Sequence, residues 1–538
     1  MFGTGPFATT PFATEPGADL SVLPPFLDLL ANPDADRFLR LDVEPWSPAA
    51  GAVVQMGYGS GNDSPLRAFG PYLIDALNYE TRIFDSLSGV ARSGSPTVGD
   101  ITLAFGDGRN DHLCRYRLGG RRVRVLMGGA NYTDAQYQEI FVGTARHSSW
   151  TPQKFSIALR DPSELVAGLV QTNRYAGTGG LEGAADLKGK VKPKAWGPFW
   201  NAPGEMVDRT ALIGQIHDGS MDSITDIFDR AVALVPDGDE VDEAALRAWV
   251  PTPFSAKYRT CLALGLYRLA DAPAGLVTVN GTGDDTGGYV DTAAGIARRI
   301  FQAQGGLADS ALELSAFAQL DTDQPARVGI FVNSEAQLLD VVDLVLASIF
   351  GWRNWTRTGL ITVGRLEFGT PAAEIGASDV DDIFDVAQIS TEAPELPARS
   401  ISLGYRRVWA RQGPEEVASL AADAQKEFVK EEFRRATWTG PLVAGENALD
   451  EEQIVDTLLA DEADAQDEAD RRGALLGSLS LRYALVVKGH QFRLRPGQTV
   501  TLKHHRFGLS AGQDFIILRL GENTTTRRTA LGLWGVAA

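Results

Sequence analysis

Apolar residues alternate with polar ones in several short stretches of the first third of the chain, which predicts β-strands there. Turn residues follow two of these stretches, at Gly106–Gly108 and Gly128–Gly129. Several short strands at this spacing are typical of a β-sandwich or barrel. The predicted strands are Ile101–Phe105, Arg122–Met127, Glu139–Gly143 and Lys154–Leu159.

Helical spacing marks two segments in the middle of the chain. Asp291 can cap a helix in which Ile296 and Ile300 share one face. Ser334–Gln337 has the form of a capping box before a second helix, and Gly351 stands where a left-handed residue would end it. The second helix is expected to bury the stripe Leu338, Val341, Val342, Val345 and Ile349.

Two strand-like segments accompany these helices. Leu276–Val279 comes before the first helix and leads into the turn-prone Asn280–Asp285. Val328–Val332 is a short apolar run that lies between the two helices. We expect both segments to belong to a small sheet with one face buried.

A hairpin is predicted to close this unit. Its first arm carries Trp352 and Trp355, Thr358–Gly359 forms the turn, and Leu360–Leu366 is the second arm. The order of strand, helix, strand, helix and hairpin within Tyr258–Leu366 is typical of an α+β unit.

Further patterns lie on either side of this unit. Asp222–Val235 has apolar residues at helical spacing, and the acidic stretch 449–476 is expected to form a helix that packs through Ile454, Leu458 and Leu459. Later strands are predicted at Ile401–Trp409, Leu479–Val487, Thr499–Leu502, Phe515–Leu518 and Thr529–Trp534.

These patterns predict a multidomain α+β chain with β-barrel or sandwich domains. Residues 1–50, which repeat Pro-Phe-Ala-Thr, are expected to form an extended N-terminal arm. A β-rich domain follows over 51–165, and a Gly-rich loop with a helical insertion over 166–257. The central α+β domain spans 258–397, and 398–538 holds a strand, the acidic helix and a C-terminal β domain.

Composition limits the classes of function. The chain has 538 residues, too many for one core, and its 69 acidic and 50 basic residues give a net charge of −19. Such a charge opposes tight gripping of nucleic acid, although it suits a surface past which DNA slides, and it also suits plain solubility. The absence of a long apolar run or secretion signal predicts synthesis in a cytoplasm without stable membrane insertion. Cys114 and Cys261 match no metal spacing and are expected to be reduced thiols.

Candidate chemistry is sparse. A metal site at His504 and His505 is not expected, because adjacent strand residues point to opposite faces. The sequence Gly508–Gly512 spells a Gly-x-Ser-x-Gly elbow around Ser510, but a strand is predicted after it and no histidine follows His505. The prediction is a turn between strands.

Two acidic groups keep an enzymatic alternative open. Asp284 with Asp285, or the cluster from Asp237 to Glu243, could supply the paired carboxylates of a glycosidase. The same cluster resembles a calcium loop, but its glycine position does not fit an EF-hand. Chance proximity in an acidic chain is the favoured interpretation of both groups.

Two loops and a tryptophan pair raise binding alternatives. The Gly-rich loop Asn173–Gly183 lacks the third glycine of a nucleotide fingerprint, and Lys188–Lys194 is either a solvated loop or a contact for an acidic partner. The segment Trp352–Trp355, or the Gly-rich loop, could stack on a cell-surface glycan. Core packing is the favoured interpretation of the tryptophans.

The sequence resembles the baseplate hub, or tail-tip, proteins of long-tailed bacteriophages and gene transfer agents. The resemblance is carried by Gly265–Leu269 leading to Gly275–Val279, by the segment from Ser334 to Trp352, and by Leu494–Val500 followed by Arg506–Leu509. Further features carry it in the Gly-rich passage after Gly179 and in the Phe-Val-Gly step that ends at Gly143.

This resemblance implies a structural virion protein of the tail tip and not an enzyme. It implies a homotrimeric hub with two tail-tube-like β domains per chain, bound to distal tail and tail-tube proteins, the tape-measure protein, and tail fibre or spike proteins. DNA would pass through its lumen during ejection without specific binding. It implies no catalytic, cofactor-binding or metal-binding residues. The alternatives are a glycan-binding tail protein that attaches to the host, or a tail-associated peptidoglycan hydrolase.

Overall fold

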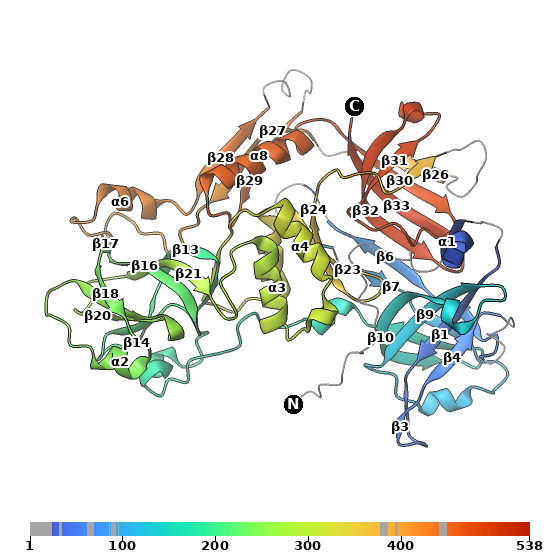
Figure 1. The fold of residues 1–538 in the computed structure, drawn as a ribbon, viewed down its shortest axis with the longest axis horizontal. Helices are drawn as coiled ribbons and strands as arrows, with labels where there is room; N and C mark the ends of the chain where they lie inside the picture. Colours follow the sequence, from blue (N-terminus) through green and yellow to red (C-terminus); the bar gives the residue numbers. More distant parts are fainter. Residues whose placement is uncertain are drawn as a thin grey trace.

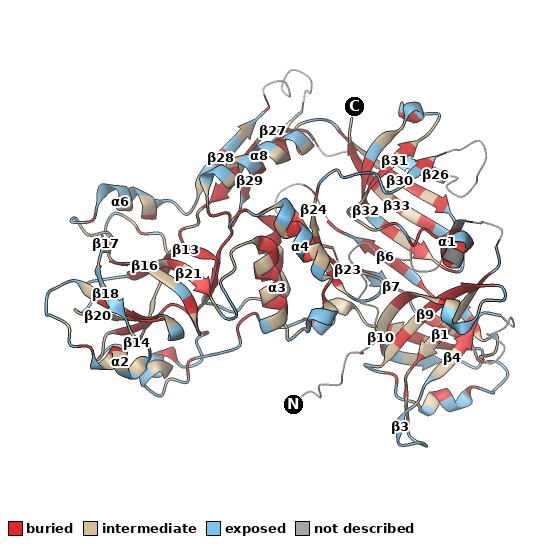
Figure 2. Ribbon diagram, viewed as in Figure 1, coloured by how far each residue is buried: buried red, intermediate tan, exposed pale blue. Residues whose placement is uncertain are grey.

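The chain folds into several β-sheets with helices between them. The computed structural model describes residues 24–537, except 32–34, 62–68, 85–86, 88–92, 95, 377–385, 393–395 and 441–448. A first β-rich part and the C-terminal sheet lie together at one end of an elongated molecule, and a second β-rich lobe forms the other end (Figure 1). Buried residues concentrate in the sheets and on the facing sides of the helices (Figure 2). The predicted multidomain α+β class is confirmed.

The first β-rich part is an antiparallel sheet with the strand order β4-β1-β9-β10-β11-β8-β5. The alternating residues face one side, so that Ile101, Leu103, Phe155 and Ile157 are all buried. All four strands predicted from alternation are confirmed. The strands are β1 (Arg37–Val43), β4 (Met56–Gly59), β5 (Leu73–Asp75), β8 (Ile101–Ala104), β9 (Arg122–Gly129), β10 (Gln138–Trp150) and β11 (Lys154–Leu159), and a separate ribbon consists of β2 (Trp46–Ser47) and β3 (Ala52–Val53).

The predicted N-terminal arm is only partly testable. Residues 1–23 lie outside the described residues. From Pro24 onward the prediction is wrong, because the chain forms helix α1 (Pro24–Ala31) and then strand β1, which pairs with β9. Phe26 is fully buried and Leu29 nearly so, which gives this segment a core to pack into.

The second β-rich lobe contains two small sheets, with the orders β13-β21-β16-β17 and β14-β15-β20-β19-β18. Its core includes Phe199, Tyr258 and Tyr267. The elements are β12 (Lys194–Trp196), β13 (Pro198–Pro203), β14 (Glu205–Asp208), β15 (Ile213–Gln215), β16 (Met221–Asp229), β17 (Val232–Ala233), β18 (Val235–Asp239), α2 (Glu243–Ala248), β19 (Lys257–Cys261), β20 (Leu266–Leu269) and β21 (Val277–Asp284).

The helix predicted over Asp222–Val235 is wrong. The segment is strand β16 and its neighbours, paired along its length with β21. A register shift between Ile224 and Asp226 breaks the alternation, so that Ile224 and Ile227, three positions apart, lie opposite Gly281 and Val279 on the same side of the strand. A β-bulge of this kind places apolar residues at intervals that imitate a helix.

The turn predicted at Asn280–Asp285 is also wrong as far as Asp284, because β21 continues through it. The glycines of β21 allow neighbouring strands to approach its backbone closely. A Cβ on Gly281 would lie 2.4 Å from the carbonyl oxygen of Ser223, and one on Gly283 would lie 2.3 Å from that of Ala195.

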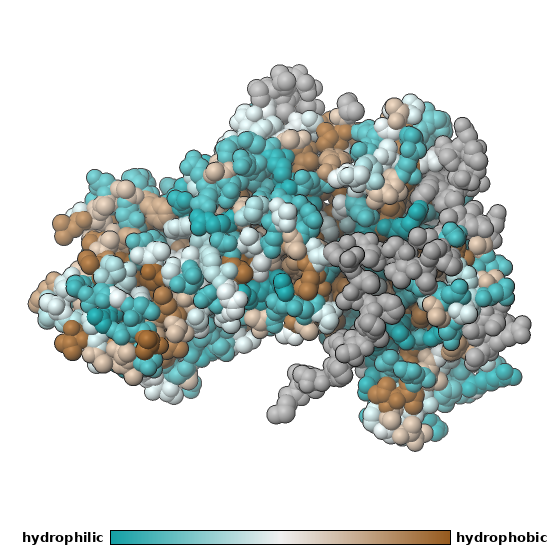
Figure 3. Space-filling model, in the orientation of Figure 1, coloured by the Kyte–Doolittle hydropathy of each residue, from teal (hydrophilic) through white to brown (hydrophobic). Residues whose placement is uncertain are grey.

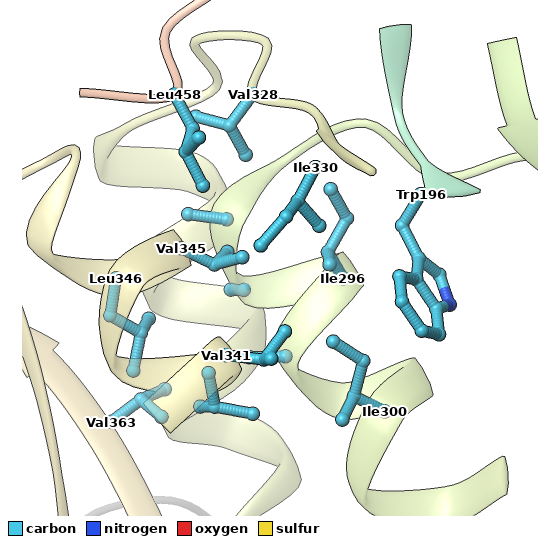
Figure 4. Close-up of a cluster of buried hydrophobic side chains, with 14 of the residues drawn as sticks. Trp196, Ile296, Ile300, Val328, Ile330, Val341, Val345, Leu346, Val363 and Leu458 are labelled. Carbon is cyan, nitrogen blue, oxygen red and sulfur yellow. The ribbon is translucent and has the colours of Figure 1, made fainter. Parts of the chain in front are cut away.

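The central part buries the apolar stripes predicted from helical spacing. Figure 4 shows Ile296 and Ile300 on one helix facing Val341 and Val345 on another, with Trp196 beside them. The hairpin is confirmed as well, with its turn at a left-handed Gly359. The elements are α3 (Ala293–Ala303), α4 (Leu314–Asp323), β22 (Ile330–Val332), α5 (Leu338–Ala347), β23 (Gly351–Trp355) and β24 (Ile361–Arg365).

The helix ends differ from the predicted ones. The side chain of Thr292, and not Asp291, caps α3 by accepting a hydrogen bond from the backbone of Gly295 at 3.1 Å. Helix α5 begins after Gln337, which makes no capping bond through its side chain, so the predicted capping box is not formed. The left-handed residue is Phe350, with φ of 55°, while Gly351 already belongs to β23.

The C-terminal part has a main sheet with the order β25-β31-β32-β33-β30-β26 and a smaller one with the order β28-β27-β29. The predicted strands at 479–487, 499–502, 515–518 and 529–534 are confirmed. The elements are β25 (Glu374–Gly376), β26 (Val386–Thr391), β27 (Ala398–Tyr405), α6 (Asp423–Lys430), β28 (Arg434–Thr439), β29 (Glu451–Asp456), α8 (Glu462–Leu476), β30 (Ser480–Lys488), β31 (Thr499–Lys503), β32 (Gln513–Asn523) and β33 (Arg528–Val536).

The acidic helix is shorter than predicted. Residues 451–456 form strand β29, which runs parallel to β27, and α8 begins only at Glu462. Ile454, expected on the packed side of a helix, is 68% exposed because Val455 takes the buried position in the strand. Leu458 and Leu459 are buried as predicted. Within the described part of the chain, none of the helices has the length and apolar character needed to span a membrane.

Candidate functional site: the junction between the β-rich parts

Strand β6 (Asn78–Arg82) joins the first β-rich part directly to the C-terminal sheet. It lies in the segment 62–98, for which sequence patterns gave no prediction, and it pairs antiparallel with β32 from Arg82 opposite Arg519 to Asn78 opposite Asn523. The backbone of Leu77 continues the contact, because its N–H donates to Thr524 Oγ1 at 3.0 Å. Short β7 (Thr97–Val98) pairs with the other side of β6.

The hairpin β23–β24 packs on β6 from the central part. The hydroxyl of Tyr79 donates to the carbonyl oxygen of Trp355 at 3.0 Å, and that of Thr81 donates to Asn354 Oδ1 at 2.9 Å. The tip of the hairpin reaches the first sheet as well, where the backbone N–H of Val142 donates to the carbonyl oxygen of Arg357 at 2.8 Å. Three parts of the chain therefore meet at one hairpin.

The side chain of Arg357 extends this contact into the C-terminal part. Its guanidinium donates to the carbonyl oxygen of Phe492 and lies 3.3 Å from Glu522 Oε2. Glu522 is fully buried, and burial raises the pKa of its carboxyl to about 7 although Arg357 opposes the shift. Burial, together with the nearby Arg37, Arg527 and Arg357, lowers the pKa of the neighbouring His490 to about 3.

The hairpin tryptophans are core residues. Trp352 is 7% exposed and Trp355 is 4% exposed. The indole of Trp352 lies between the backbones of Gly364 and Gly497, where a Cβ would come within 2.5 Å of its Cζ2 in either case. Neither ring presents a face to solvent on which a glycan could stack, so core packing is the correct interpretation.

A cavity of about 800 Å³ opens at this junction, between α4, the hairpin and the turn before β31. Its charged side chains are tied to one another, as in the pairs Arg495–Glu313 at 2.7 Å and Arg365–Glu367 at 2.5 Å. The junction is thus a network of paired charges and close backbone contacts. It can hold the β-rich parts in one fixed geometry.

Asp284 is placed in a different, strongly basic setting inside the second lobe. Its carboxylate lies 2.7 Å from Arg299, 3.9 Å from Lys194 and 3.8 Å from buried His217. Burial alone would raise the pKa of Asp284, but the nearby His217, the charge of Lys194 and the hydrogen bond from Arg299 lower it to about 2. A carboxylate held ionised in this way does not suit the proton donor of a glycosidase.

The carboxylates between Asp237 and Glu243 are used in local contacts. Lys257 lies 2.6 Å from Asp237, Arg259 is paired with Glu240, and Asp242 caps α2 through the backbone of Ala245 at 2.8 Å. The hydrogen bond from Lys257 lowers the pKa of Asp237. No cluster of three or more metal-ligating side chains occurs among the described residues.

The two loops singled out by composition fold onto their own neighbours. In the Gly-rich loop, the N–H of Gly177 donates to the carbonyl oxygen of Glu182 at 2.8 Å. The side-chain carboxylate of Glu182 accepts a hydrogen bond from Lys192 at 2.7 Å. Lys190 is paired with Glu205, and Lys194 donates to the carbonyl oxygen of Asp218 at 3.2 Å. The basic patch is therefore largely neutralised within the chain.

The C-terminal candidates form a turn. Ser510 lies in a short 3-10 segment, Leu509–Ala511, between β31 and β32, as predicted. The expected orientation of His504 and His505 is wrong, since both follow the end of β31 and their rings lie 4.3 Å apart. Sequence reasoning missed Arg357 and Glu522, because these partners are 165 positions apart and belong to no motif.

Comparison with solved structures finds phage tail proteins that extend over most of this chain. They include a tail protein from Neisseria meningitidis (11% identity, TM-score 0.34), covering 92% of this chain and 96% of its own. A 43 kDa prophage tail protein from Shewanella oneidensis has 10% identity and a TM-score of 0.36, and the match covers 92% of this chain and 98% of that one. A prophage tail protein from Listeria monocytogenes has 8% identity and a TM-score of 0.38, and the match covers 92% of this chain and 94% of that one. No protein-family model matches the chain, and no curated protein matches it.

Proposed function

We propose that this chain is a structural subunit of a phage-type tail tip, a baseplate hub that assembles as a homotrimer at the distal end of the tail tube. It joins the tube and the end of the tape-measure protein to fibre or spike proteins, and it surrounds the channel through which DNA leaves. Its virion role is structural and requires no catalytic site.

The observation that carries the proposal is a segment of the first β-rich part that crosses into the C-terminal sheet. Strand β6 lies between β5 and β8 of the first sheet in the chain, but it pairs with β32 as a strand of the C-terminal sheet, so the two sheets are tied together by this segment. Arg357 at the hairpin tip contacts both β-rich parts. Its carbonyl oxygen accepts a hydrogen bond from the N–H of Val142 in the first part, and its guanidinium donates to the carbonyl oxygen of Phe492 in the C-terminal part. Three such chains around an axis would present six β domains, which is how a three-fold hub would match a six-fold tube.

The charge of the chain suits a channel for DNA. A net charge of −19 repels phosphate, so DNA would not adhere to a wall of this composition. The glycan-binding alternative loses the tryptophans as a stacking surface, because Trp352 and Trp355 are packed inside. The hydrolase alternative loses Asp284 as its proton donor, because this carboxyl group is held ionised.

The solution mass of the purified chain, measured by light scattering and accompanied by negative-stain images, tests the proposal. A trimeric ring with a central hole is the expected result. Since a hub subunit can need the tube before it assembles, the decisive sample is the chain mixed with its tail-tube protein. A monomer that persists in that mixture would reject the trimeric hub.

A further inference from the structure

Phe254 is held out in solvent by the backbone. Its side chain is 97% exposed, and its φ of 56° lies in the left-handed region, which is unfavourable for a large residue. Ala256 also has a positive φ, 52°. Such conformations persist only where surrounding contacts determine them, and they cluster at binding sites.

Several contacts determine this conformation. The carboxylate of Asp271 accepts hydrogen bonds from the N–H groups of Phe254 at 2.7 Å and Ala256 at 3.1 Å. The base of the loop is fixed by Arg268, which donates to the carbonyl oxygen of Trp249 at 2.8 Å. Pro253 restricts the backbone just before the phenylalanine. The exposed ring is therefore preorganised, which lowers the entropy lost when it is bound.

Two other exposed apolar residues belong to this loop or to the strand bonded to it. Val250 is 88% exposed, and Val235 is 50% exposed and joined to the loop by a hydrogen bond from its N–H to the carbonyl oxygen of Ala256 at 2.8 Å. Val235 opens β18, the outermost strand of its sheet. We call Val235, Val250 and Phe254 the Phe254 surface. Figure 3 shows apolar residues exposed on the lobe that carries it.

The charges around the Phe254 surface are acidic. Between Val235 and Ala256 the exposed charged residues are Asp239 and Asp242. The cationic side chains of this region form ion pairs within the chain. Lys257 lies 2.6 Å from Asp237, and Arg247 lies 2.7 Å from Asp208. A partner with lysine or arginine beside its apolar contact would complement this pattern. A second copy of a chain with a net charge of −19 would not.

We propose that the Phe254 surface binds a segment of a different protein in which apolar side chains alternate with lysine or arginine. The phenyl ring and the two valines take the apolar side chains. Asp239 and Asp242 are exposed and accept hydrogen bonds within the chain through Oδ1, and they offer their negative charge to the cations. The exposed sheet edge at β18 would receive such a segment in extended form. This inference does not depend on the hub proposal, because it uses only the contacts of this lobe.

Fluorescence anisotropy with the full-length chain and a labelled peptide of alternating valine and lysine tests the inference. The matched probe is a peptide of alternating valine and glutamate. We expect the basic peptide to bind and the acidic one not to bind, and Phe254→Ser to weaken binding at least about tenfold. Leu420→Ser, which removes another apolar side chain that is 88% exposed, should leave the affinity unchanged.

The salt dependence of peptide binding and the self-association of the chain complete the test. Asp239→Asn with Asp242→Asn should reduce the salt dependence of binding, because fewer charges take part. Equal affinity of wild type and F254S, absence of binding by the basic peptide, or equal binding of both peptides would overturn the inference. Self-association that F254S abolishes, detected by light scattering, would instead assign the surface to a second copy of this chain.

Discussion

The indole of Trp352 lies directly against the backbone of Gly497, and this contact joins the hairpin of the central part to the C-terminal sheet. Gly497 has φ of 89°, and a Cβ at this position would be 2.5 Å from Trp352 Cζ2. On the other side of the ring, a Cβ on Gly364 would be equally close. Both glycines are therefore required by the tryptophan that they enclose.

Gly497→Ala is expected to destabilise the protein through two effects. The left-handed backbone costs about 1 kcal/mol for alanine, and overpacking against Trp352 adds about 1–3 kcal/mol. Gly359→Ala is the matched control, since Gly359 has φ of 83° but its nearest contact for a Cβ is an oxygen at 3.6 Å. Calorimetry should show the larger drop in Tm for G497A.

A double variant separates the two effects further. Trp352→Phe removes the Cζ2 that a new Cβ would meet, so W352F should be less harmful in G497A than in the wild-type chain. Additive effects of the two substitutions would contradict the contact described here.

Local patterns predicted the elements whose partners are near in sequence. The stripe Val341, Val342 and Val345 and the strand Ile101–Ala104 are buried as their spacing requires. Predictions failed where a neighbouring segment changes the local pattern. The bulge at Ile224 imitates a helix, and Thr292 caps α3 although Asp291 beside it has an equally suitable side chain.

The junction could not be predicted for a different reason. Glu80 on β6 lies 2.7 Å from Arg519 on β32, and these residues are 439 positions apart. Strand pairing at such a distance depends on the whole fold, and β6 is only five residues long, with Tyr79 and Thr81 at its buried positions. The resemblance to hub proteins did not indicate which residues hold the parts of the chain together.

Glu522 makes the stability of the junction depend on pH. Its pKa in the folded chain is raised to about 7, above the ordinary value of 4.5, so the folded state retains the proton over this interval. Stability therefore falls as pH rises from the unfolded-state pKa through the folded-state pKa. The loss attributable to this carboxylate amounts to at most about 3 kcal/mol.

Glu522→Gln is expected to remove much of that dependence. The variant should raise Tm relative to wild type more at about pH 8 than at about pH 5, because the amide carries no charge to bury. Glu80→Gln, which changes a carboxylate on β6 that is 40% exposed, is the control and should have a similar small effect at both values. An equal gain for E522Q at both pH values would contradict the role assigned to its ionisation.

The buried pair of Glu468 and Arg472 on α8, with the partly exposed Arg471 beside it, holds the end of α5. Arg472 lies 2.7 Å from Glu468 and donates to the carbonyl oxygens of Ala347 at 2.8 Å and Ser348 at 3.1 Å, at the end of α5. Arg471 also pairs with Glu468, at 2.9 Å. Burial alone would raise the pKa of Glu468, but the two guanidinium groups outweigh it and lower that pKa.

Arg472→Met should therefore be strongly destabilising, by about 3 kcal/mol or more, because it leaves buried carbonyls and a half-paired buried carboxylate. Urea unfolding followed by tryptophan fluorescence measures the change. Arg209→Met removes a pair with Asp186 in which both side chains are at least half exposed, and it should cost less than about 1 kcal/mol. The double variant Arg472→Met with Glu468→Leu should recover part of the stability, since the buried carboxylate is then gone and the only charge left without its partner is the partly exposed Arg471. A loss in R472M no greater than in R209M would show that α8 does not hold the end of α5.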